Sequence, residues 1–184
     1  RIEHLREVDG IEITPEEVEE LESIPSAGKP HIANILSRRG ISGTRTEIIS
    51  KYLEFGVDNR IPAELAIKAI KSSGGFAIWA HPLGGENEAH MNRDELEAKL
   101  DVLQSIGIEG LECFYSRYDE AETAMLLDVA ESWGLLVSGG SDFHGKNKNV
   151  EIGDLGVSKK PVYDSDLSLV AELRRRRLKK QLIV

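Results

Sequence analysis

The sequence has little of several things that would point to particular classes of protein. No run approaches the roughly 18 consecutive apolar residues of a membrane span, and the first residues, Arg1-Ile2-Glu3-His4, lack the apolar core of a signal peptide. The single cysteine, Cys113, cannot form an internal disulfide. These absences disfavour membrane insertion and secretion and fit a reducing compartment, so we expect a cytoplasmic protein with no membrane partner.

Basic residues are also fewer than acidic ones. The 184 residues include 23 Lys and Arg against 32 Asp and Glu, a net charge of −9. This balance argues against a surface that coats nucleic acid by bulk charge, but it allows a small site that holds phosphate through metal ions. A hydrophobic content of 40% is enough for a folded domain. Because the first residue is arginine, we expect the chain to be trimmed or part of a longer polypeptide.

The first part of the chain has the pattern of short helices. Thr14 with Glu17, and Thr44 with Glu47, have the spacing of capping boxes that begin helices. In the last of the four expected helices we place Leu65, Ala66, Ala69 and Ile70 on one apolar face. The expected helices cover residues 15–23, 28–40, 44–53 and 62–74. We predict a helical domain over 1–60, from which the fourth helix leads out.

The pattern changes from residue 75 onward. Near-continuous apolar runs, which are typical of strands buried on both faces, alternate with helical periodicity. We expect strands at 76–80, 111–115 and 135–138, and helices at 94–105, 120–133 and around 167–177. This alternation predicts an α/β fold with parallel strands. The arginines at 174–177 are taken as a solvated helix face.

Polar residues follow all three expected strands. His81 comes after the first strand, Ser116 and Arg117 after the second, and Asp142 and His144 after the third. The carboxyl ends of parallel strands converge, and residues two apart in an extended segment point the same way. The sequence therefore predicts that His81, Asp142 and His144 bind a metal, with zinc, manganese or iron favoured over calcium or magnesium.

Each of these residues has a simpler interpretation. A histidine after a strand is often a structural loop residue, and an isolated Asp-x-His is weak evidence for a metal. Glu112 could serve the fold or the site, and both alternatives stay open. Cys113 lies within an expected strand with no base nearby, so we interpret it as a buried side chain and not as a nucleophile.

Several segments resemble the PHP family, the polymerase and histidinol phosphatase superfamily of metal-dependent phosphoesterases. Those that resemble its carboxyl-terminal motifs are Trp79–Pro82, Gly110–Glu112 and, above all, Ser138–Gly145. Two further segments, Gly28–Ala33 and Lys51–Leu53, are similar to the helical insertion of the TrpH/YciV-like branch. That branch is associated with nucleoside 3′,5′-bisphosphate phosphatase and 5′-to-3′ exoribonuclease activity.

The resemblance implies a distorted (β/α)7 barrel with two or three divalent metal ions, of which this chain would be the helical insertion (1–60) and the carboxyl-terminal part (61–184). It makes His81, Asp142 and His144 metal ligands, and it puts Lys29 and His31 in contact with substrate phosphate. From its charge and its place after the second strand, we expect Arg117 to contact the phosphate as well. The substrate would be a small nucleotide or short RNA.

The resemblance also has a gap, because the family's amino-terminal ligand motifs have no counterpart in this sequence. We therefore expect the missing part of the barrel to be needed, and the 184-residue chain alone to be inactive and prone to associate. Two alternatives remain: a phosphatase of another small metabolite such as histidinol phosphate, and a metal-free PHP-like regulatory or structural module.

Overall fold

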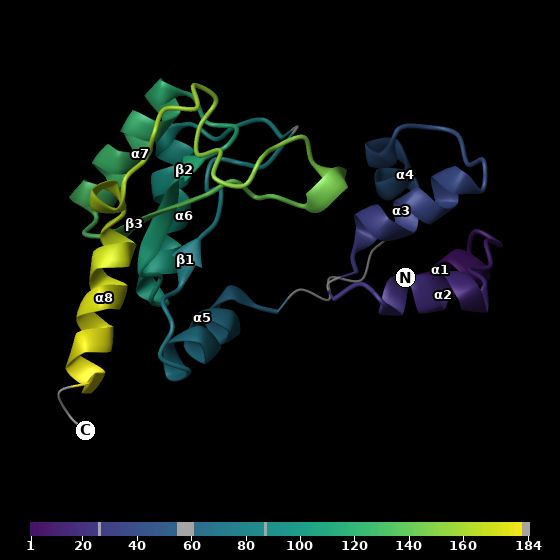
Figure 1. Ribbon diagram of the computed structural model, residues 1–184, viewed down its shortest axis with the longest axis horizontal. Helices are drawn as coiled ribbons and strands as arrows, with labels where there is room; N and C mark the ends of the chain where they lie inside the picture. The colour runs from purple at the N-terminus through teal and green to yellow at the C-terminus, as the bar shows by residue number, and fades with distance from the viewer. Residues whose placement is uncertain (26, 55–60, 87, 182–184) are drawn as a thin grey trace. The chain divides into compact units, whose positions relative to one another are not determined.

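The computed structural model describes residues 1–25, 27–54, 61–86 and 88–181. By their internal contacts the residues form two compact units, Arg1–Asn59 and Arg60–Val184, coloured purple to blue and teal to yellow in Figure 1. Among the helices in these described ranges, none combines the length and apolar character needed to cross a bilayer. The assignment of the units to an insertion domain and a barrel part stays a prediction.

The first unit is a small bundle of helices. The predicted capping boxes are both present: Thr14 and Glu17 exchange hydrogen bonds at the start of α2, and Thr44 and Glu47 do so at the start of α4. A core cluster that includes Leu5, Leu36 and Leu53 holds the bundle together. The helices of this unit are α1 (Ile2–Glu7), α2 (Pro15–Glu22), α3 (Lys29–Arg38) and α4 (Arg45–Tyr52).

Helix α1 was not predicted from the sequence. It is a helix of six residues with no side-chain cap, so its local signal is weak. Its stability comes from tertiary contacts, because Leu5 is fully buried in the core of the unit and Arg1 donates a hydrogen bond to the carbonyl of Leu53.

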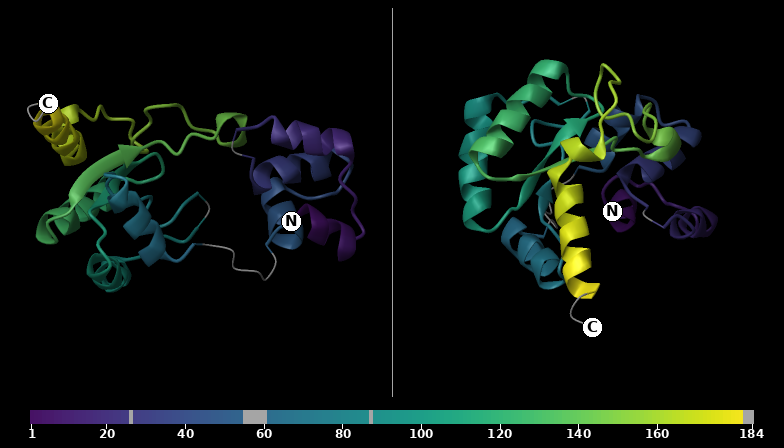
Figure 2. Two further views of the ribbon diagram at one scale, coloured as in Figure 1. Left: turned by 90° about the horizontal axis from the view of Figure 1, so that it is seen from below. Right: turned by 60° about the vertical axis from the view of Figure 1, so that its left-hand side comes forward.

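The second unit alternates strands and helices, as predicted. Its three strands lie in the order β1-β2-β3 and pair in parallel, with α7 and α8 packed beside them (Figures 1 and 2). A core that includes Leu100, Leu111 and Leu126 fills the space between sheet and helices. The elements are α5 (Ala63–Ser72), β1 (Ile78–Trp79), α6 (Arg93–Ser105), β2 (Gly110–Tyr115), α7 (Glu120–Ser132), β3 (Leu136–Gly140) and α8 (Ser168–Gln181).

Two predictions about the start of this unit are wrong in detail. The first strand covers only Ile78–Trp79, and both residues are half-buried because β1 has a single neighbouring strand in the described sheet. On α5 the buried residue is Ile67, whereas Leu65 and Ile70 are 56% and 40% exposed. The predicted apolar face of α5 therefore has little to pack against within the described residues. The seven-stranded barrel stays a prediction.

The run of arginines near the C-terminus lies on the solvated helix face that the sequence predicts, since 66% of the Arg174 side chain and 55% of the Arg175 side chain are exposed, and it also makes ion pairs. Arg174 pairs with Asp164 at 2.5 Å and Arg175 with Glu172 at 2.6 Å. Arg176 lies over the ring of Phe76 at 3.5 Å from its centroid. At least three of the four arginines thus make contacts within α8 or between α8 and the rest of its unit.

Candidate strand-end metal site

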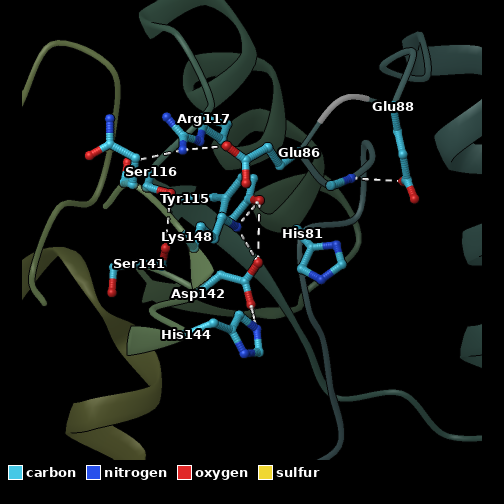
Figure 3. Close-up of polar contacts among 12 residues, drawn as sticks. His81, Glu86, Glu88, Tyr115, Ser116, Arg117, Ser141, Asp142, His144 and Lys148 are labelled. Carbon is cyan, nitrogen blue, oxygen red and sulfur yellow. Dashed lines mark hydrogen bonds and ion pairs between the residues drawn. The ribbon is translucent and has the colours of Figure 1, made fainter. Parts of the chain in front are cut away.

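The carboxyl ends of the three parallel strands bring the predicted ligands to one edge of the sheet. His81 follows β1 and Asp142 follows β3, with Tyr115 at the end of β2 between them (Figure 3). His81 and Asp142 both have left-handed backbones, with φ of +32° and +53°. Residues other than glycine adopt this conformation at a cost, and such strain gathers at functional sites. Among the described residues, three residues other than glycine have a positive φ, and the sequence pattern selected two of them, His81 and Asp142, but not Lys159.

Asp142 and His144 form the centre of the site. Oδ1 of Asp142 lies 2.9 Å from Nε2 of His144, and the imidazole is 66% exposed. The carboxylate is less accessible, with 26% of its side chain exposed. One hard oxygen and one imidazole nitrogen therefore adjoin each other at an open position, as the Asp-x-His spacing predicted.

Lys148 contacts the same carboxylate and was not singled out by the sequence. Its Nζ donates to Oδ2 of Asp142 and to the hydroxyl of Tyr115, the latter at 2.8 Å. Burial opposes ionisation of Asp142, but the hydrogen bond and charge of Lys148, followed by those of His144, hold the pKa of Asp142 below its usual value. Lys148 lies outside the strands and helices expected from the sequence, so no signal in the sequence marked this side chain.

Glu112 on β2 holds His81 in place. The backbone N–H of His81 donates to Oε2 of Glu112 at 2.7 Å, and the ring of His81 lies against Tyr115 with centroids 5.5 Å apart. Burial raises the pKa of Glu112, although the His81 hydrogen bond works in the opposite direction. The Glu112 carboxylate therefore lies beside His81, but its contact is to the backbone, so the structural and the site role both stay open for Glu112.

Arg117 lies beside a polar pocket of about 310 Å³ whose lining also includes Ser116 and Lys159. Its guanidinium donates to Oε1 of Glu86 at 2.6 Å and to the carbonyl of Asn149 at 3.1 Å. Its Nε is buried and has no hydrogen-bond partner among the described residues. Arg117 thus keeps one donor uncommitted close to the strand ends.

Lys29 and His31 lie in the first unit, at the start of α3. Nδ1 of His31 accepts a hydrogen bond from the Gly28 N–H at 3.0 Å, and Lys29 Nζ lies 3.1 Å from Oε1 of Glu54. His31 therefore acts as a helix cap and Lys29 as one half of an exposed ion pair. Neither contact tests whether these residues also bind substrate.

Cys113 is fully buried in β2, and burial raises the pKa of its thiol to about 12. A thiol in this state is a poor nucleophile. The interpretation of Cys113 as a small core side chain agrees with this environment.

The donor set fits part of the coordination sphere of a divalent metal. Asp142 and His144 offer the oxygen and nitrogen ligands that zinc, manganese and iron accept. In the ranges that the structure describes, no three His, Cys, Asp or Glu side chains converge on one point. The fit is therefore to an ion held by this pair, with His81 nearby and further ligands needed.

Comparison with known proteins identifies relatives of the chain, although no family model matches it. The phosphoribosyl 1,2-cyclic phosphate 1,2-diphosphodiesterase of Eggerthella lenta is 30% identical over 106 residues, which are 55% of this chain and 37% of that protein. The 5′-3′ exoribonuclease Rnm of Escherichia coli is 30% identical over 128 residues, or 67% of this chain and 42% of the relative. The chain thus spans about two fifths of the length of the curated relatives it matches.

Solved structures give the same result for the fold. A protein described as a metal-dependent phosphoesterase of Bifidobacterium adolescentis superimposes with a TM-score of 0.60 at 27% identity, covering 86% of this chain and 57% of that one. An amidohydrolase of Chromobacterium violaceum, solved with bound sulfate and no metal, gives a TM-score of 0.59 at 25% identity over 78% and 51% of the two chains.

By its relatives and its fold, the chain is related to the class of hydrolytic phosphoesterases. The particular resemblance predicted from the sequence, to the PHP superfamily and its exoribonuclease branch, is confirmed by these relatives.

Proposed function

We propose that the protein is a metal-dependent phosphoesterase that hydrolyses nucleotide phosphate esters, either nucleoside 3′,5′-bisphosphates or the 5′ ends of short RNA. The observation that carries the proposal is the Asp142–His144 pair on a strained strand end beside His81. The names of the exoribonuclease relatives support the nucleotide substrate.

In this proposal Asp142, His144 and His81 hold a divalent ion, which is manganese, zinc or iron by its donor types. When bound, such an ion polarises a phosphoryl group and activates water for attack on phosphorus. Glu112 keeps the His81 backbone in its left-handed conformation by accepting its N–H. Arg117, which lines the polar pocket beside the strand ends, binds substrate phosphate, and Lys29 and His31 add further contacts from the helical unit.

We propose that the other ligands and the rest of the barrel, which the resemblance implies, come from outside these 184 residues. We propose that the 184-residue chain alone is inactive, because Asp142 and His144, with His81 nearby, leave the coordination of a metal incomplete. Two or three ions, as the resemblance implies, would require those further ligands.

A second candidate is hydrolysis of a small sugar phosphate. It is favoured by the relative from Eggerthella lenta, whose name gives phosphoribosyl 1,2-cyclic phosphate as its substrate. Assays of the complete polypeptide with a nucleoside 3′,5′-bisphosphate, a 5′-phosphorylated short RNA, phosphoribosyl 1,2-cyclic phosphate and histidinol phosphate will separate the candidates. Hydrolysis of none of these, together with no bound metal, would favour the metal-free module instead.

The test of the metal ligands is His144→Ala in the complete polypeptide. Loss of even a partner that supports a metal ligand costs about 10- to 100-fold in affinity or activity, so loss of the ligand itself should cost at least as much. His90→Ala is the matched control, because His90 lies in the same unit and pairs with Glu122. Elemental analysis should show less metal in His144→Ala alone, with the fold retained. Equal metal content and activity in both variants would refute the assignment.

A further inference from the structure

Lys148 is a buried cation, and its contacts with residues of the site fix its position. The residue is only 9% exposed. Its Nζ lies 2.8 Å from the Tyr115 hydroxyl and 4.9 Å from the centroid of that ring. Lysine is almost never buried to this degree unless its charge is paired. The pairing partner is Asp142, which is itself a proposed metal ligand.

The contacts of Asp142 divide its carboxylate into two halves. Oδ1 faces the exposed imidazole of His144 at 2.9 Å, and Oδ2 faces the ammonium of Lys148 (Figure 3). A carboxylate that bridges two metal ions uses both oxygens. Here one oxygen is already occupied by a positive charge that belongs to the chain, and the charge of the carboxylate is balanced before any ion arrives.

We infer that Lys148 is a built-in cation of this site, and that its ammonium takes the position on Oδ2 of Asp142 that a second metal ion would otherwise occupy. A divalent ion then binds on the Oδ1 side, with His144. The ammonium also repels a dication nearby, so it weakens metal binding to this half of the site. The inference rests on the proposed function to the extent that it assumes the site binds metal.

The experiment compares Mn²⁺ binding to the 184-residue chain and its variants by isothermal titration after removal of metal with a chelator. Lys148→Met replaces the ammonium by an uncharged side chain of similar length, whereas Lys148→Arg keeps the charge. Lys146→Met is the matched control, because Lys146 is an exposed lysine two residues away. Tyr115→Phe removes the phenol contact and leaves the charge in place.

Lys148→Met should bind Mn²⁺ at least about 10-fold more tightly than the unmodified chain, or bind an additional equivalent, because a repulsive charge has been removed and Oδ2 is freed. The other three variants should bind as the unmodified chain does. Equal or weaker binding by Lys148→Met, including no binding by any form, would overturn the inference.

A second measurement covers the case in which Lys148→Met folds poorly. Removing the ammonium leaves the Asp142 carboxylate without its counter-charge, so the melting temperature in chelator should fall. Mn²⁺ should restore it, because the metal then supplies the missing charge. A fall that Mn²⁺ does not reverse would overturn the inference. Failure of the proposed function would instead appear as a complete, metal-loaded polypeptide that hydrolyses no phosphate ester.

Discussion

A side chain at Gly140 is expected to destabilise the fold, although the backbone conformation of Gly140 is open to any residue. It is the last residue of β3 and pairs with Tyr115 at the end of β2. A Cβ added at Gly140 would lie 2.3 Å from Oε1 of Glu112. Since ordinary contact begins near 3.4 Å, Gly140→Ala must push the Glu112 carboxylate away by about 1 Å.

The cost of this movement follows from what holds the carboxylate. Oε2 of Glu112 accepts the N–H of His81 at 2.7 Å, and a shift of about 1 Å takes this contact beyond hydrogen-bond distance. Loss of a hydrogen bond to a charged group costs about 1.5–3 kcal/mol. We therefore expect Gly140→Ala to lower the free energy of unfolding by about 2 kcal/mol, and the melting temperature by roughly 4–8 °C for a chain of this size.

Thermal unfolding of metal-free protein, followed by circular dichroism, will measure the change. Gly156→Ala is the control, because its added Cβ would meet only the Tyr118 carbonyl at 3.6 Å. In a Glu112→Ala background the Gly140→Ala substitution should add less than about 0.5 kcal/mol, since its target is gone. An effect equal to that of Gly156→Ala, or one that persists in full without Glu112, would refute the role given to this contact.

Two further predictions concern single side chains. Cys113 should react with a thiol reagent at pH 8 only after unfolding, and ready labelling of the folded protein would contradict this. The fold raises the pKa of Cys113 from 9.0 to about 12. The contribution of Cys113 to stability is therefore complete below pH 9 and should be lost as the pH rises toward 12. At the start of α3, His31→Ala should lower the free energy of unfolding by about 1 kcal/mol, because it removes the acceptor for the Gly28 N–H. Lys29→Ala should leave stability nearly unchanged and reduce hydrolysis by the complete polypeptide about 10- to 1,000-fold. Unchanged kinetics would assign Lys29 to its ion pair with Glu54 alone.

Local signals predicted the features of this chain that depend on few residues. The helix starts at Thr14 and Thr44 were predictable because each capping box is made by residues three apart. The parallel order of strands followed from their alternation with helices. The Asp142–His144 pair was predictable because the spacing that joins the two side chains lies within one segment.

Features that depend on distant partners were not predictable. Lys148 lies in a polar stretch, and only the fold brings it to Tyr115, 33 residues earlier. The need for glycine at 140 comes from Glu112 on another strand. The buried face of α5 was predicted wrongly, because the periodicity of the sequence indicates an apolar stripe but does not show which residues pack against it. Helix α1 depends on the burial of Leu5 more than on its own sequence.

The left-handed backbone at Asp142 also limits how this site can change over evolution. At φ of +53°, asparagine and glycine fit nearly as well as aspartate, whereas β-branched residues do not. One nucleotide change converts an aspartate codon to asparagine, and this replacement would remove the negative charge while keeping the turn. The same replacement would leave the buried ammonium of Lys148 without its counter-charge, so a descendant that exchanged catalysis for a purely binding role through Asp142→Asn would also have to replace Lys148.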